Sequence, residues 1–187
     1  MKSKYGPFTS RDLTLVAGLT GLYLVYGYAS GVTLGHAILE LDLFFLISAL
    51  FTIVVSMTGK RWSATLLGVV NGLILLGEPN APLAITLSLI PNGLVFDLSL
   101  YARDHTIDGL PRKRFVIAGA LGNLAMAISG LVILQAIGFF QGKGLDFILA
   151  TSVIALVTNP LVGAIGALFG TVVVKRVGER VRSPLIR

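Results

Sequence analysis

Long blocks of apolar residues constrain this chain more than any other feature of its sequence. Hydrophobic residues make up 55% of its 187 residues and charged residues 13%, and the apolar residues run together in stretches of twenty or so. A soluble domain usually carries about a quarter charged residues. About 20 apolar residues span the hydrocarbon core of a bilayer, where every backbone N–H and C=O must be hydrogen-bonded internally. Unbroken blocks, rather than short alternating segments, predict membrane-spanning helices and not a β-barrel.

We expect an all-α membrane protein, with residues 1–187 forming a single transmembrane domain. Its six-helix bundle has spans at about 13–32, 37–57, 62–77, 81–101, 115–140 and 145–174. If these spans alternate, fourteen of the 15 Lys and Arg residues fall on one side and Lys143 alone falls on the other. The positive-inside rule then places both termini in the cytoplasm. The first span follows a basic stretch, as signal peptides do, but it is longer than a signal core, so we expect it to be retained.

Composition and missing motifs exclude several function classes. The chain has no cysteine, which rules out disulfides and thiolate chemistry. Its net charge of +6 lies in short connections and at the ends rather than along one face, so we expect headgroup contacts and no nucleic acid. The sequence has no Gly-x-Ser-x-Gly, His-Glu-x-x-His or phosphate-loop pattern. We therefore expect neither an enzyme nor a bound cofactor.

Polar side chains within the spans are candidate ligand contacts, because such groups are costly in lipid unless they face protein, water or ligand. Asn71 lies in the third span, Asn92 follows Pro91, and Asn159 precedes Pro160. Each proline frees a backbone carbonyl one turn earlier, which a neighbouring Asn can satisfy. Alternatively, these interrupted turns line a cavity and offer amide groups to a polar ligand, with Gln135 reaching the same outer half.

A second group of candidates stands at the predicted outer ends of the spans. His36 and Glu40 are four residues apart and would share a helical face, and Glu78 and Asn80 lie in the connection between the third and fourth spans. One histidine with scattered carboxylates is a weak metal-ligand set, so we expect no metal site. Tyr28 ends the first span, where tyrosine either anchors the helix at the membrane interface or stacks on a planar ligand.

Asp97 lies near the inner end of the fourth span. An acid at membrane depth is a functional candidate. The sequence favours an ion pair with Arg103, Arg112 or Arg114 at the cytoplasmic boundary.

Small residues recur at helical spacing. Ala17 and Gly21 are four apart in the first span, and similar pairs occur in the fifth and sixth spans. Such pairs let helix backbones approach closely in lipid. They serve either packing within the chain or, on the first helix, docking of a partner membrane subunit.

The chain resembles the substrate-binding S components of energy-coupling-factor vitamin transporters over nearly its whole length. The resemblance rests on pattern: a basic start leading into Arg11-Asp12-Leu13 and the Ala17-x-x-x-Gly21 pair, the turn at 59–62, and the Gly-rich stretch 163–170 before a basic tail. Residues 45–103 are most similar to the branch associated with thiamine precursors such as hydroxymethylpyrimidine. That branch tends to carry acidic residues in its third span, where this chain has Asn71 and no carboxylate. The difference argues against a cationic or pyrimidine-type substrate.

This resemblance implies a substrate-capture subunit of the cell membrane. It would bind a vitamin or vitamin precursor from outside, while a transmembrane coupling subunit and two ATPase subunits would supply the energy. The substrate contacts would come from Tyr28, His36, Glu40, Asn71, Glu78, Asn80, Gln135 and Asn159, and the coupling contact from Ala17 and Gly21. A stand-alone oligomeric permease or channel, and a membrane scaffold without a ligand, remain alternatives.

Overall fold

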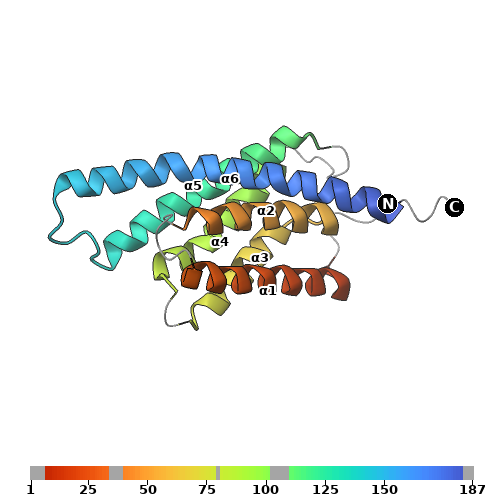
Figure 1. Cartoon of the computed structure of the whole chain (residues 1–187), viewed down its shortest axis with the longest axis horizontal. Helices are drawn as coiled ribbons and strands as arrows, with labels where there is room; N and C mark the ends of the chain where they lie inside the picture. Colours follow the sequence, from red (N-terminus) through yellow and green to blue (C-terminus); the bar gives the residue numbers. More distant parts are fainter. Residues whose placement is uncertain (1–6, 34–39, 79–80, 102–109, 183–187) are drawn as a thin grey trace.

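The computed structural model describes residues 7–33, 40–78, 81–101 and 110–182, and all secondary structure in these ranges is α-helical. Side chains are described for the same ranges except 31–33 and 178–182. The helices are α1 (Ser10–Thr33), α2 (Leu41–Thr58), α3 (Ser63–Leu75), α4 (Leu83–Tyr101), α5 (Arg112–Ala136) and α6 (Leu145–Arg182). They run back and forth in one bundle, with the start of α1 and the end of α6 at the same end (Figure 1).

Five of these helices are long and apolar enough to cross a membrane, as expected of a multi-pass membrane protein. The remaining helix, α3, has only 13 residues. At 1.5 Å per residue it spans about 20 Å, well short of a hydrocarbon core of about 30 Å. Crossing by α3, and the side of the membrane on which the termini lie, therefore stay predictions.

Several predicted helix boundaries are corrected by the structure. The second helix begins at Leu41 rather than 37, because Glu40 takes the left-handed conformation with φ 57° and cannot continue a helix. Glu40 is therefore not part of α2, and the helical face predicted for His36 and Glu40 stays a prediction, because His36 lies outside the described residues. The fifth helix ends at Ala136 rather than 140, before a turn in which Gly138 and Gly142 have positive φ. The sixth continues to Arg182, eight residues past the predicted end.

Close backbone contacts at glycines hold the five helices from α2 through α6 together. A Cβ on Gly93 would lie 2.5 Å from the Ala64 carbonyl oxygen, and one on Gly68 would lie 2.5 Å from that of Leu89, so α3 and α4 meet backbone to backbone. Gly119 and Gly163 join α5 to α6 in the same way, each facing the other's carbonyl oxygen. This is the packing that small residues permit in lipid, where no hydrophobic force drives helices together.

The first helix differs from the others. It packs only lightly, against α2 and α3. Ala17 and Gly21 are exposed, and a Cβ on Gly21 would meet no atom of the described chain within 4 Å. Polar contacts fix it at its two ends. Asp12 forms an ion pair of 2.8 Å with Lys60, and the Ser30 hydroxyl donates to the Asp42 carboxylate.

These two environments predict opposite effects of the same substitution. Gly163→Ala should lower the free energy of unfolding by about 1–3 kcal/mol, the usual cost of overpacking, because its Cβ would fall 2.7 Å from the Asn123 Cβ. Gly21→Ala should raise it by about 0.5–1 kcal/mol, because alanine favours the helix and finds open space. Thermal unfolding in detergent measures both. Equal effects of the two variants would contradict the packing described here.

Candidate ligand-binding cavity

The side chain of Asn123, in the middle of α5, is the polar centre of the bundle. It is completely buried, and its Nδ2 donates to the backbone oxygens of Phe44 and Asn159, both at 3.2 Å. Its Oδ1 accepts hydrogen bonds of 3.0 Å from the Ser48 hydroxyl and from Asn92 Nδ2. A single carboxamide therefore joins α5 to α2, α4 and α6, and uses its full donor and acceptor capacity.

The three asparagines predicted from the sequence have different surroundings. Asn92 bonds across the bundle to Asn123 and to the Met126 sulfur at 3.1 Å, rather than to a carbonyl freed by Pro91. The Nδ2 of Asn71 donates to the Leu67 carbonyl within its own helix at 2.9 Å. The side chain of Asn159 is only 6% exposed, yet it makes no hydrogen bond within the described chain, and its Oδ1 is an unpartnered buried atom. The Oδ1 atoms of Asn71 and Asn92 are also buried without a partner, but of the three side chains only that of Asn159 has neither its oxygen nor its nitrogen bonded within the described chain.

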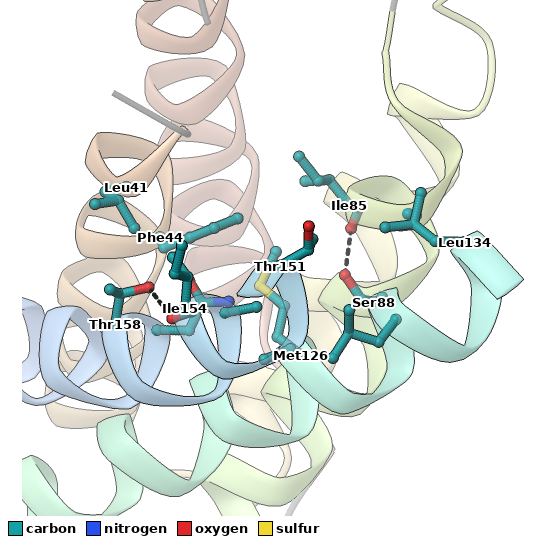
Figure 2. Close-up of a pocket in the computed structure, with 15 residues that line it drawn as sticks. Leu41, Phe44, Ile85, Ser88, Met126, Leu134, Thr151, Ile154 and Thr158 are labelled. Atoms are coloured by element: carbon teal, nitrogen blue, oxygen red, sulfur yellow. Dashed lines mark hydrogen bonds between the residues drawn. The ribbon is translucent and has the colours of Figure 1, made fainter. Parts of the chain in front are cut away.

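A cavity of about 250 Å³ lies beside Asn159, between α2, α4, α5 and α6. Its walls are mainly apolar, and Figure 2 shows Phe44, Ile85, Met126, Leu134 and Ile154 among the side chains around it. The complete lining consists of Leu41, Phe44, Ala84, Ile85, Ser88, Met126, Ala127, Gly130, Leu131, Leu134, Thr151, Ile154, Ala155, Thr158 and Asn159. A concave apolar site with a few polar groups is typical of small-molecule binding.

Some polar side chains that line the cavity already make hydrogen bonds within the protein, and others do not. The Ser88 hydroxyl donates to the Ile85 carbonyl at 2.9 Å, and the Thr158 hydroxyl donates to that of Ile154 at 2.7 Å (Figure 2). Thr151 makes no hydrogen bond in the described chain, and its hydroxyl points away from the α6 ribbon (Figure 2). Asn159 and Thr151 are therefore the two groups ready to bond a ligand.

The cavity lies at one end of the bundle. Its lining comes from the first turns of α2 and α4, the last turns of α5 and the first half of α6. The basic turn with Lys60 and Arg61 joins the end of α2 to the start of α3, at the end of the bundle opposite the cavity. With the orientation predicted by the positive-inside rule, the cavity faces the outside of the cell.

Most other predicted contact residues lie away from this cavity. Tyr28 is 78% exposed on α1, and Glu78 and Gln135 are also exposed. Glu40 is half-buried just before α2, and Asn71 is buried in α3, but neither lines the cavity. His36 and Asn80 lie outside the described residues. Among the described residues, no group of three or more His, Asp or Glu side chains is placed to hold a metal ion.

Asp97 has a different partner from the one expected. Its Oδ2 accepts hydrogen bonds of 2.7 Å from both the backbone N–H and the hydroxyl of Thr65, in the first turn of α3. In the described chain it forms no ion pair with Arg112 or Arg114, and Arg103 lies outside that part. The first N–H groups of a helix lack intrahelical partners and favour a carboxylate. Asp97, which belongs to α4, therefore caps the start of the neighbouring helix α3.

Sequence reasoning missed the residues that organise the site. Asn123 stands between glycine-rich turns without a proline beside it, and Ser48 and Thr151 look like ordinary helix residues. The one available clue was that Asn123 is a polar residue at the centre of a long apolar span.

Comparison with known proteins gives no further guidance, because no family model, curated protein or solved structure matches the chain.

The contacts of Asn123 predict a large effect of removing its amide. Asn123→Leu should lower the free energy of unfolding by about 1–3 kcal/mol, because it leaves the buried Ser48 and Asn92 side chains without their shared acceptor. Thermal unfolding in detergent gives the comparison. Ser129→Ala on the same helix is the control, since its hydroxyl bonds only to carbonyls of its own helix. An Asn123→Leu protein as stable as the Ser129→Ala protein would contradict the organising role of Asn123.

Proposed function

We propose that this protein is the substrate-capture subunit of an energy-coupling-factor type importer, which binds a vitamin or vitamin precursor from outside the cell. The observation that carries the proposal is the cavity beside Asn159, a partly open apolar site with an unused amide. A buried amide without a partner costs free energy, and a bound ligand would recover it.

The first helix supports the coupling part of the proposal. Ala17 and Gly21 lie on a surface that nothing in the described chain covers. Next to it, a groove of about 480 Å³ runs between α1 and α2, lined by Leu15, Gly18 and Met57 among others. A partner transmembrane helix could approach closely here, as small residues allow. This partner would belong to the membrane subunit that couples capture to two ATPases.

The packing below the cavity argues against a channel formed by this bundle. Asn123 bonds to all three neighbouring helices at the inner end of the cavity, and the Gly119–Gly163 contact joins α5 and α6 beyond it. A path through the bundle would have to break these contacts. Capture at a closed site, with movement driven by partner subunits, fits this arrangement better than a stand-alone permease.

Ligand retention tests the capture function. Protein purified in mild detergent should carry a small molecule that mass spectrometry detects after extraction. Gly130→Phe should abolish this retention, because Gly130 lines the cavity and a Cβ there meets only the Ala84 carbonyl oxygen, at 3.9 Å. The phenyl ring would therefore occupy the cavity with little disturbance of the fold. Ala136→Phe, at an exposed position of the same helix, is the matched control and should retain the ligand. Capture is ruled out if the unmodified protein retains no small molecule, or if Gly130→Phe retains as much.

Uptake tests the coupling surface. Ala17→Leu and Gly21→Leu should each block uptake in cells that contain the coupling subunits, because a bulky side chain holds the partner helix away. Ligand retention should stay unchanged, since neither position lines the cavity. Ala136→Leu serves as the control for added bulk on an exposed surface. Normal uptake by both α1 variants would show that this surface is not the docking site.

A further inference from the structure

We infer that the cavity selects an uncharged ligand of about one ring, which presents a hydrogen-bond donor next to an acceptor to the amide of Asn159. The inference rests on the proposed capture function and adds the chemical class of the ligand.

The described wall of the cavity offers no counter-ion to a ligand. None of its described lining residues is charged, and the acids nearest along the chain are not part of its wall: Asp42 accepts the Ser30 hydroxyl, and Glu40 precedes α2. A charged ligand taken from water into an apolar site costs far more than a neutral one unless an opposite charge meets it. The cavity therefore discriminates against both cations and anions.

The amide of Asn159 sets the hydrogen-bond pattern. Its backbone carbonyl accepts from Asn123, which fixes the residue in place, while the side chain makes no hydrogen bond in the described chain. A carboxamide has an acceptor oxygen beside a donor NH₂, so its complement is a donor beside an acceptor, as in a primary amide, a lactam or an amino-substituted nitrogen ring. Asparagine reads such a pair on adenine through two parallel hydrogen bonds.

The size of the cavity limits the ligand to about one ring. A dry cavity of about 150 Å³ in another protein holds benzene. The cavity here has about 250 Å³, which leaves room for a ring and a few further atoms. Within the described chain, Thr151 supplies an unbonded hydroxyl on the same wall, on α6 two turns before Asn159. A short polar substituent on the ring can reach it.

Four ring compounds of nearly equal size separate these features. Benzamide is neutral and carries a donor beside an acceptor, acetophenone is neutral with an acceptor only, benzoate is an anion, and benzamidinium is a cation. Their dissociation constants for the full-length protein, freed of retained ligand in detergent, are measured by ligand-observed NMR. Benzamide should bind about tenfold or more tightly than each of the other three. Equal or tighter binding of a charged compound, or no binding of any of the four, would overturn the inference.

Substitutions of residues that line the cavity test whether Asn159 causes the preference for benzamide. Asn159→Leu should weaken benzamide binding about tenfold to a hundredfold and leave acetophenone binding within about threefold. The variant should fold, because leucine has a similar size and no hydrogen bond of the Asn159 side chain is lost. Thr158→Val is the control, since the Thr158 hydroxyl is already bonded to Ile154, and it should keep the benzamide preference. An unchanged preference in Asn159→Leu would also overturn the inference.

The ligand class and the capture function can fail separately. A natural ligand that is retained and displaced by Gly130→Phe, but charged at neutral pH, would overturn the ligand class and leave capture standing. A protein that retains no natural ligand would overturn capture, whatever its preference among the four compounds.

Discussion

The bundle depends on the hydrogen bonds of Asn123, and these depend in turn on glycines that let the helices approach. Apolar lipid offers no partner to a carboxamide, so Asn123 is stable inside the bundle only where neighbouring helices supply donors and acceptors. A Cβ on Gly163 would lie 2.7 Å from the Asn123 Cβ, and a Cβ on Gly122 would lie 2.6 Å from the Asn92 Oδ1. Larger residues at either position would push the amide out of hydrogen-bond range. The polar contacts and the close backbone packing therefore form one interdependent arrangement.

This arrangement also explains why the cavity lies where it does. Toward the basic end of the bundle, Gly166 and Gly170 of α6 lie against the backbone of α2. A side chain at either glycine would displace the described residues around it. Toward the other end, the first half of α6 has exposed or half-buried residues up to Thr158, and the α5–α6 hairpin extends beyond the other helices (Figure 1). The cavity lies in this part of the bundle, and its lining includes Phe44 and Asn159, whose backbone carbonyls accept hydrogen bonds from Asn123.

The sequence determines the class of fold much better than it determines the site. Apolar blocks and Gly- or Pro-containing turns predict helices close to those observed, because both reflect local chemistry. Glu40 and Asp97 show where local reasoning fails: the first adopts a left-handed conformation, and the second caps a neighbouring helix, which only the tertiary fold brings within reach. Asn159 was found from its place beside Pro160. The importance of Asn123 depends on contacts with three other helices, and no spacing along the chain reveals these.

The first turn of α2 belongs both to the cavity and to the support of α1. Leu41 and Phe44 line the cavity, the Phe44 carbonyl is bonded to Asn123, and Asp42 between them accepts the Ser30 hydroxyl near the end of α1. The other end of α1 is fixed by the Asp12–Lys60 ion pair, outside the influence of the cavity. Since α1 otherwise packs lightly, a ligand that displaces the first turn of α2 would act mainly on the Ser30 end of α1. The cavity and the Ser30 end of α1 thus share one short segment, the first turn of α2, although no residue of α1 lines the cavity.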